Sequence, residues 1–258
     1  MKITLFTANS RRHNYFINLL ATISDELFVV QESRTIFPGL VKSERVSSKT
    51  MDNYFQKVSS AEQKIFGNNY INSKNVKIMP LRAGDLNNCT MKFLKDFLKS
   101  DFYIVFGSSY IKGELIDFLI KRKAVNIHMG VSPYYRGTDC NFWALYDENP
   151  HLVGATIHML SKGLDSGSML YHAMAHPKKN LFEYSMSTVK SAFHSLADRI
   201  KSKDIFKYKP EIQNKLKEIR YSKLQEFNDN VIKRFNKKKP NKKFNFKKDM
   251  LKNPYFLK

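Results

Sequence analysis

The sequence predicts an α/β protein: a Rossmann-like, mainly parallel sheet with helices on both faces, followed by a basic C-terminal appendage. Apolar segments of strand length alternate with segments of helical spacing through roughly the first half of the chain, as in sheets built from crossover units. One such segment, residues 102–106 (FYIVF), is apolar throughout, which is typical of a parallel strand buried on both faces. Positive charge instead concentrates after about residue 204, where the periodicity is lost.

The alternation defines the expected elements of the N-terminal half. Strands are expected at residues 2–7, 27–30, 76–79, 102–106 and 124–128, and helices near residues 15–20, 50–66, 91–98 and 111–119. Gly67 is a typical C-cap, and Pro80 is expected to end the third strand. The N-terminus predicts a strand rather than a signal peptide, because its apolar run is soon interrupted. Ligands of such sheets bind beyond the carboxyl ends of the strands, which makes the end of 124–128 a candidate site.

The C-terminal half has a different pattern. Residues 153–159 and 169–176 are expected to pair as a hairpin, and residues 181–200 form a long amphipathic helix. The chain after residue 205 is Lys- and Asn-rich, with scattered aromatic residues and no sustained period. We therefore predict one domain at 1–204 and a loosely packed or partly disordered basic appendage at 205–258, whose role is unknown.

The net charge of +21 is unevenly distributed. Residues 201–258 hold 19 Lys and Arg against 6 Asp and Glu, whereas the first 200 residues hold 25 against 17. The lysines of the tail include Lys237, Lys238, Lys239, Lys242, Lys243, Lys247 and Lys248. Such a tail could contact phosphates or an acidic membrane surface, although a solvated extension is slightly favoured.

Composition excludes several classes of protein. No run of eighteen apolar residues is present, so no transmembrane segment is expected. Two cysteines, Cys89 and Cys140, are too few for a disulfide framework and lack the spacing of metal ligands. We expect free thiols in a reducing cytoplasm and no metal.

The candidate chemistry begins at the last strand of the N-terminal half. Asn126 and His128 lie two residues apart, so a strand places them on one face, with Val125 and Ile127 on the other. An amide donor beside an imidazole can hold an oxygen that develops charge while a proton is relayed. Taken alone, the pair is a weak signal, and a satisfied polar pair at a sheet edge is the better interpretation.

Later segments strengthen the interpretation. A loop at residues 132–137 combines Pro, Tyr, Arg and Gly, and the only tryptophan, Trp143, follows on a short helix. Asp165 lies in a glycine-flanked loop after the strand at 153–159. Its carboxylate is either a turn former or the group that orients and charges an imidazole; spacing alone favours the turn.

Together these segments resemble the 10-formyltetrahydrofolate-dependent formyltransferase family, which includes enzymes acting on glycinamide ribonucleotide, methionyl-tRNA and amino sugars. The matching segments are Asn126-Ile127-His128, Pro133-Tyr134-Tyr135-Arg136-Gly137, Asn141-Phe142-Trp143, Gly154-Ala155-Thr156-Ile157-His158 and Asp165-Ser166-Gly167. Their order and spacing agree throughout residues 101–172, and the resemblance is looser over 1–100. Gly130 stands where the family commonly has Ser, with Ser132 at a usual Leu position, which could loosen the loop.

The resemblance implies a reaction. The formyl group of 10-formyltetrahydrofolate passes to an amine, Asn126 donates to the oxyanion, and His128, oriented by Asp165, accepts the amine proton or stabilises the oxyanion. No metal is required. The remaining histidines are expected to be structural or at the surface: His13, His151, His158, His172, His176 and His194.

The resemblance also implies binding residues. The run from Asp139 to Trp143 is most similar to the sugar N-formyltransferases, whose acceptors are nucleotide-linked amino deoxysugars used in surface polysaccharide synthesis. Substrate contacts are expected from Arg11, Arg12, Tyr135, Arg136 and Trp143, and folate contacts from Leu81, Arg82, Gly163 and Leu164. The arginine pair begins a helix, where an anion such as a phosphate is favoured, although a solvated helix start is comparably expected.

Two alternatives stay open. A methionyl-tRNA formyltransferase would explain the basic tail, but residues 205–258 are short for its C-terminal barrel and lack strand alternation. An inactive scaffold that binds nucleic acid or a membrane is opposed by the complete set of Asn126, His128 and Asp165. A nucleic-acid partner is thus open but not favoured, a homo-oligomer is open, and a small-molecule acceptor is expected.

Overall fold

The computed structural model describes residues 1–33, 48–238 and 244–257. Three of the tail lysines named above, Lys239, Lys242 and Lys243, lie outside these ranges. Within them, no helix has both the length and the apolar character required to cross a membrane.

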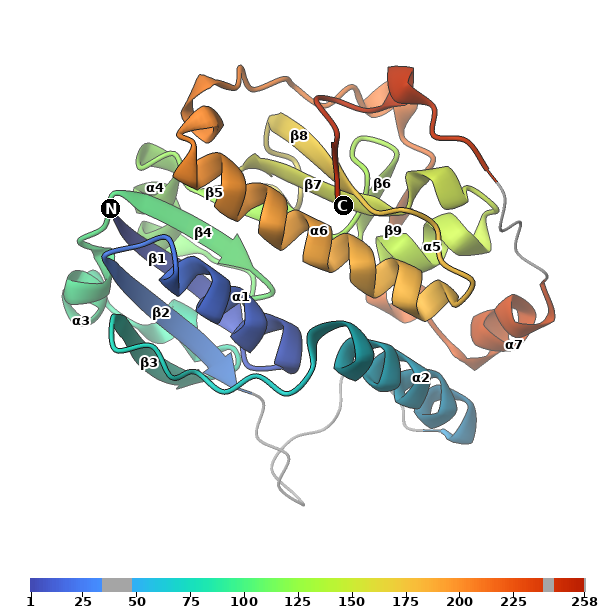
Figure 1. Ribbon diagram of the computed structural model, residues 1–258, viewed down its shortest axis with the longest axis horizontal. Helices are drawn as coiled ribbons and strands as arrows, with labels where there is room; N and C mark the ends of the chain where they lie inside the picture. The colour runs from blue at the N-terminus through green and yellow to red at the C-terminus, as the bar shows by residue number, and fades with distance from the viewer. Residues whose placement is uncertain (34–47, 239–243, 258) are drawn as a thin grey trace.

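A mixed sheet forms the centre of the described chain, in the order β10-β8-β7-β5-β4-β1-β2-β3 (Figure 1). Its strands are β1 Lys2–Ala8, β2 Glu26–Ser33, β3 Val76–Arg82, β4 Phe102–Phe106, β5 Val125–His128, β7 Gly154–Met159, β8 Met169–Met174 and β10 Tyr255–Phe256. Every pairing is parallel except those of β7, which runs antiparallel to β5 and β8. A short parallel pair, β6 Tyr135–Gly137 with β9 Arg220–Ser222, lies apart from this sheet. The predicted mainly parallel sheet and the predicted hairpin are confirmed.

Helices cover both faces, as predicted. They are α1 Arg11–Ala21, α2 Lys49–Phe66, α3 Met91–Leu94, α4 Gly113–Lys121, α5 Cys140–Tyr146, α6 Leu181–Lys201 and α7 Asp229–Lys237. Short 3₁₀ helices occur at Asp85–Asn88, Lys95–Leu98, Pro150–Leu152, Asp204–Lys207, Lys215–Lys217, Leu224–Glu226 and Lys248–Met250. The apolar residues of α1, α2 and α6 pack against one face of the sheet, and those of α3 and α4 against the other.

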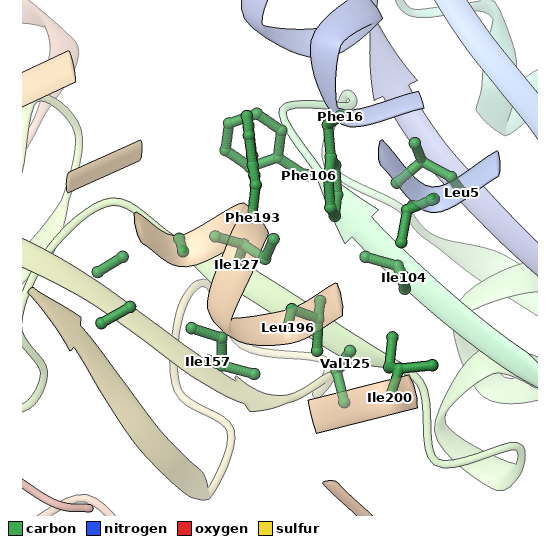
Figure 2. Packing of buried hydrophobic residues seen from close by; sticks show 14 of the residues in the cluster. Leu5, Phe16, Ile104, Phe106, Val125, Ile127, Ile157, Phe193, Leu196 and Ile200 are labelled. Atoms are coloured by element: carbon green, nitrogen blue, oxygen red, sulfur yellow. The ribbon is translucent and has the colours of Figure 1, made fainter. Parts of the chain in front are cut away.

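The long helix α6 anchors one face of the sheet. Its residues Phe193, Leu196 and Ile200 are buried against the strands, and Figure 2 shows them facing Val125 and Ile127 of β5. The ring of Phe193 stacks on Phe16 of α1, with 4.2 Å between centroids. Removing a buried side chain such as Leu196 by substitution with Ala costs about 2–5 kcal/mol. Because Val125 and Ile127 point into this core, their neighbours on β5 must face the opposite side.

Several element boundaries differ from expectation by a few residues, and two elements differ in a way that has a clear structural basis. Strand β3 continues through Pro80 to Arg82, because β3 pairs on one side with β2 and ends the described sheet, where a missing N–H is tolerated. The helix expected at 91–98 divides into α3 and a 3₁₀ turn at Lys95–Leu98.

The described part of the tail is packed rather than loose. Strand β9 pairs with β6, β10 pairs with β8, and α7 buries Ile232 and Phe235. Phe227 and these two residues belong to the same apolar cluster as Trp143 of α5. The charge-rich composition hid this packing because its apolar residues are too widely spaced to form a periodic pattern. The boundary at 204 stays a prediction, but the described residues beyond it are integrated into the fold.

Candidate active site

Strand β5 carries the first two site residues to the carboxyl end of the sheet. Val125 and Ile127 lie in the core beneath α6, so Asn126 and His128 emerge together on the other face, as predicted. His128 is buried and Asn126 is partly buried. The antiparallel register places His158 of β7 opposite Asn126.

Asp165 is brought to this face by the loop between β7 and β8. Its backbone has a positive φ of 46°, and Gly167 passes so close to β7 that a Cβ there would lie 1.7 Å from the carbonyl oxygen of Met159. Gln213 Nε2 donates to the carbonyl oxygens of Asp165 (2.7 Å) and Gly167 (2.8 Å). Loop and tail together therefore fix the carboxylate.

His128 and Asp165 form a close pair. His128 Nδ1 lies 3.2 Å from Asp165 Oδ2, and His128 Nε2 lies 3.1 Å from the backbone carbonyl oxygen of Tyr135. Burial disfavours the charged imidazole, but the Asp165 carboxylate and, after it, Cys140 outweigh this effect and raise the pKa of His128 well above 6.5. Burial likewise opposes charge on Asp165, and His128 outweighs that effect and lowers the Asp165 pKa. Since both ring nitrogens of His128 face oxygen acceptors, the site favours imidazolium beside carboxylate.

A second histidine, His158, completes the cluster. His158 Nδ1 lies 2.8 Å from the carbonyl oxygen of Met159, which can only accept, so Nδ1 carries the proton in the neutral ring. His158 Nε2 therefore accepts from Asn126 Nδ2 at 2.9 Å. The other amide hydrogen of Asn126 has only a weak contact, 3.5 Å to Asp165 Oδ1. Asn126 is thus oriented by His158, with one hydrogen available to a substrate oxygen. Of the two expectations for His158, a structural or a surface role, its burial and its contact with Asn126 agree with the structural one.

Gly130 explains how the loop after β5 is held. A Cβ at this position would lie 2.5 Å from His128 Nε2, 2.7 Å from Cys140 Cβ and 2.9 Å from the Tyr135 carbonyl oxygen. The loop backbone is fixed by Thr156, whose hydroxyl donates to the Gly130 carbonyl oxygen (2.6 Å) and accepts from Ser132 N–H (2.8 Å). The absent side chain therefore makes room for His128, and the loop is not loosened.

Two cavities meet at His128. The first, here called the Tyr54 cavity, has a volume of about 340 Å³ and lies between α2, α5 and the start of α6. The second, here called the Asp165 cavity, has a volume of about 390 Å³ and is lined by Asn126, Asp165 and residues 108–111. Residues common to both linings are Phe106, Gly107, His128, Met129 and Gly137. The site can therefore bring two ligands to one imidazole.

The predicted folate residues separate into two pairs. Gly163 and Leu164 line the Asp165 cavity, whereas Leu81 and Arg82 do not. Leu81 packs in the core on the α3–α4 face, and Arg82 forms an exposed pair with Asp85. Their place is taken by residues 108–111 after β4, which carry no distinctive motif but follow a buried parallel strand.

The predicted anion site at the start of α1 is filled by a side chain of the chain itself. The carboxylate of Glu62 accepts from the backbone N–H of Arg12 (3.0 Å), the guanidinium of Arg12 (2.9 Å) and the hydroxyl of Ser10 (2.9 Å). Arg12 also lines the Tyr54 cavity, whereas Arg11 bonds to Asn68 near the surface. The prediction that this arginine pair holds a phosphate is thus not supported by the arrangement.

The other predicted acceptor residues stabilise the fold around the site. Tyr135 is buried and bonds Asp147 and Asn149 through its hydroxyl. Arg136 pairs with Glu218 and donates to the Leu164 carbonyl oxygen, so it braces the Asp165 loop. Trp143 is buried beneath the guanidinium of Arg220, 4.3 Å from the ring centroid.

None of these three side chains lines either cavity, and the acceptor contacts predicted for them stay predictions. In this structure the three side chains pack against the protein itself, and a sequence motif does not distinguish a residue that packs from one that binds a ligand. Across the described ranges, no group of three or more His, Cys, Asp or Glu side chains could hold a metal ion.

Comparison with known proteins agrees with this architecture. A family model described as Formyl transferase matches residues 46–202. A sugar N-formyltransferase from Shewanella sp. is 14% identical, with a TM-score of 0.52 over 88% of this chain and 78% of that chain. An N-formyltransferase from Helicobacter canadensis, in complex with folinic acid and dTDP-3-aminofucose, is 10% identical, with a TM-score of 0.51 over 91% of this chain and 79% of that chain.

At such identities the structural likeness establishes the fold. The family match covers more than half of the chain and includes Asn126, His128 and Asp165. The chain therefore belongs to the formyl transferase family and is an enzyme of formyl-group transfer.

Proposed function

We propose that the protein transfers the formyl group of 10-formyltetrahydrofolate to the amine of a nucleotide-linked amino deoxysugar, in the cytoplasm, for surface polysaccharide synthesis. The observation that carries the proposal is the meeting of two cavities at His128, with Asn126 and Asp165 in the second. A transfer between two substrates requires such an arrangement, since donor carbon and acceptor nitrogen must approach each other beside the same catalytic groups.

The folate donor is assigned to the Asp165 cavity. This cavity is lined by the Asp165 carboxylate, the His128 imidazole and the Asn126 amide, so the formyl group belongs beside them. A solved relative supports a folate as the donor, because the Helicobacter canadensis enzyme is described as a complex with folinic acid. Leu164 and the segment 108–111 are then the contacts we expect for the donor.

The proposed reaction begins when the neutral amine attacks the formyl carbon. A C–N bond forms, and the formyl oxygen becomes an oxyanion that accepts from Asn126 Nδ2–H and faces the His128 imidazolium. His128, once its Nε2–H leaves the Tyr135 carbonyl oxygen, then protonates N10 of the folate as the carbon–N10 bond breaks. The proton lost by the acceptor nitrogen restores the imidazolium, so the enzyme ends unchanged. Asp165 stabilises the charged imidazole throughout. The raised pKa of His128 supports a role as acid and oxyanion stabiliser over a role as neutral base.

The acceptor is assigned to the Tyr54 cavity. Aromatic and aliphatic side chains dominate its lining, among them Tyr54, Phe142, Phe182 and Val58. This surface suits a deoxysugar better than a phosphorylated ribose, and Glu62 already occupies the anion position at α1. The Helicobacter canadensis relative, described with dTDP-3-aminofucose, supports the same class of acceptor.

The decisive experiment incubates the purified protein with 10-formyltetrahydrofolate and a panel of acceptors, and follows the release of tetrahydrofolate. The panel contains 3-amino and 4-amino deoxysugars linked to dTDP, UDP and GDP, glycinamide ribonucleotide, and charged initiator tRNA. Turnover on an amino-sugar nucleotide is expected. Turnover on the tRNA with none on any sugar would overturn the proposed acceptor.

Truncation at residue 205 is a poor test of the tRNA alternative. It would remove β10 from the central sheet and Phe227, Ile232 and Phe235 from the core, so loss of activity would follow from unfolding. Substitution of the exposed tail lysines Lys237 and Lys247 with Gln leaves the core intact and tests the same question.

A further inference from the structure

We propose that His13 is an acceptor-binding residue, whose Nε2 atom accepts a hydrogen bond from an N–H or O–H group of the acceptor in the Tyr54 cavity. This inference rests on the proposed function. It concerns a histidine that the sequence motif does not include, on a different strand–helix junction from the catalytic cluster. The donor group on the acceptor is either the reacting amine or a hydroxyl beside it, and the experiment below separates the two.

The position of His13 is set by the first turn of α1 and by the end of β4. The side chain is 3% exposed, and its ring lies 5.0 Å from the ring of Phe106. Gly107, with a φ of 70°, follows Phe106, and a Cβ on it would lie 2.6 Å from His13 Nε2. Both His13 and Gly107 line the Tyr54 cavity, as does His128. The Nε2 side of the ring therefore faces Gly107, one of the residues that line both cavities.

The hydrogen bonds of the ring locate its proton. His13 Nδ1 lies 2.7 Å from Ser10 Oγ, and the Ser10 hydroxyl donates its single hydrogen to Glu62 Oε1 at 2.9 Å. A serine that has given its hydrogen to a carboxylate can only accept from the histidine, so Nδ1 carries the proton. In a neutral ring, Nε2 is then left with a lone pair. The hydrogen bonds that link Glu62, Ser10 and His13 therefore fix the tautomer in which Nε2 is a hydrogen-bond acceptor on the cavity side.

Charge and burial keep the ring neutral. Burial, and secondarily the neighbouring guanidinium of Arg12, lower the pKa of His13 well below 6.5. Nε2 has no hydrogen bond to the described residues and is not one of the fully buried polar atoms that lack a partner, so it is open to the cavity that its ring lines. A ligand that supplies an N–H or O–H group would satisfy this atom, and an acceptor lacking that group would leave it unpaired.

The surroundings of Nε2 define the class of group it recognises. In the lining of this cavity, Phe106, Met129 and Leu145 present apolar surface, the guanidinium of Arg12 is paired with Glu62, and Asp139 contributes a carboxylate. The cavity therefore suits a donor group carried on a ring with an apolar face, as in an amino deoxysugar. Because the ring is held neutral, His13 accepts a hydrogen bond from the amine or its neighbouring hydroxyl, and the proton transfers stay with His128.

The kinetic test compares His13→Leu with His13→Gln in the full-length protein. His13→Leu is expected to raise KM for the acceptor by about tenfold or more, as for loss of one buried hydrogen bond, while KM for the folate is unchanged. His13→Gln, whose amide oxygen reaches the place of Nε2, is expected to recover part of the loss. The matched control is His194→Leu, a half-buried histidine of α6 that bonds Tyr15 and lines neither cavity. Equal effects of His13→Leu and His194→Leu would overturn the inference.

A second pair of acceptors identifies the group that His13 recognises. With an analogue that lacks the neighbouring hydroxyl, His13→Leu and the wild type should show the same KM if the hydroxyl is the donor. A persisting tenfold difference assigns the bond to the amine. A His13→Leu effect confined to kcat with every acceptor would contradict a binding role.

An independent measurement separates this inference from the proposed function. In ¹⁵N-histidine-labelled protein, the free enzyme should show His13 as the neutral tautomer protonated at Nδ1, and Ser10→Ala should disturb that tautomer. Observation of a proton on Nε2 at neutral pH would overturn the inference even if formyl transfer is confirmed. If the expected tautomer is observed but no amino sugar is turned over, the proposed function alone is contradicted. Binding of the same acceptor panel would then be followed through the Nε2 resonance of His13.

Discussion

His128 Nδ1 lies 3.2 Å from Asp165 Oδ2, between a strand end and a loop that are 37 residues apart in the sequence. The contact holds an imidazolium and a carboxylate together in a largely buried site, and each partner favours the charged form of the other. The charge states of both residues at neutral pH follow from this contact.

Substitution of Asp165 with Asn removes the charge that opposes the burial of His128. The pKa of His128 should then fall, because desolvation remains and the carboxylate, its largest raising influence, is absent. Turnover at neutral pH should fall by about 10²-fold or more, as for loss of a general acid. NMR titration of His128 is the measurement, and an unchanged His128 pKa in the variant would refute the assigned pairing.

The same pair predicts how stability depends on pH. The contribution of His128, whose pKa is raised, is fully present below 6.5 and is lost as the pH rises through the raised value. The contribution of Asp165, whose pKa is lowered, is present above 3.8 and is lost as the pH falls through the lowered value. The difference in unfolding free energy between the wild type and Asp165→Asn should therefore be largest between pH 3.8 and pH 6.5, where both contributions are present. A difference that does not vary with pH, measured by urea unfolding, would contradict this.

Asn126→Ala should lower kcat by about 10²–10³-fold, as for loss of one oxyanion donor. His158→Ala should have a smaller effect, because His158 acts by orienting the Asn126 amide through the 2.9 Å contact. Since both changes affect one interaction, the double variant should be no slower than Asn126→Ala. Melting temperatures serve as the control for folding. Full additivity of the two effects would show that His158 has a separate role.

Gly130→Ala should impair the enzyme although it adds a single methyl group. That group would meet His128 Nε2, Cys140 Cβ and the Tyr135 carbonyl oxygen, all at 2.9 Å or less, and a displaced His128 would lose its geometry with Asp165. Overpacking of this kind costs about 1–3 kcal/mol of stability. Thermal unfolding and the His128 NMR resonances should both change. Wild-type activity with unchanged His128 resonances would show that the loop adapts without displacing the ring.

Glu62→Ala should destabilise the protein by about 2–3 kcal/mol, because the buried carboxylate accepts three hydrogen bonds at the start of α1. Glu183→Ala is the matched control, since its partner Lys64 is largely exposed and such a pair contributes about 0–1 kcal/mol. Added sulfate should raise the melting temperature of Glu62→Ala more than that of the wild type, by occupying the emptied anion position. Equal sulfate effects on both proteins would show that Glu62 does not fill such a position.

Local pattern was sufficient for much of the fold. The strand-length run at 102–106 and the alternation of Asn126 and His128 with Val125 and Ile127 were confirmed, because the side-chain period of a strand is a property of the backbone. The resemblance carried by Asn126, His128 and Asp165 led to the correct family for the same reason, since the spacing of a motif is preserved in the sequence.

Long-range contacts were not predictable in this way. His158 could have been suspected only from its place opposite Asn126, which depends on the register of β7 against β5. Arg136 and Trp143 were assigned to the substrate, yet their partners are Glu218 and Arg220, some eighty residues later in the chain. A charged or aromatic residue in a motif has the same sequence signature whether it meets a ligand or a distant segment.

The sequence by itself determined the class of sheet, the place of Asn126 and His128 on one face of a strand end, and the family to which the chain belongs. The tertiary structure alone decided which groups meet there. It brought Asp165 beside His128, placed Glu62 at the start of α1, and placed His13 in the lining of the Tyr54 cavity. The physical reason is that periodicity and motif spacing act over a few residues, whereas the charge state and orientation of a buried side chain depend on neighbours that only folding brings together.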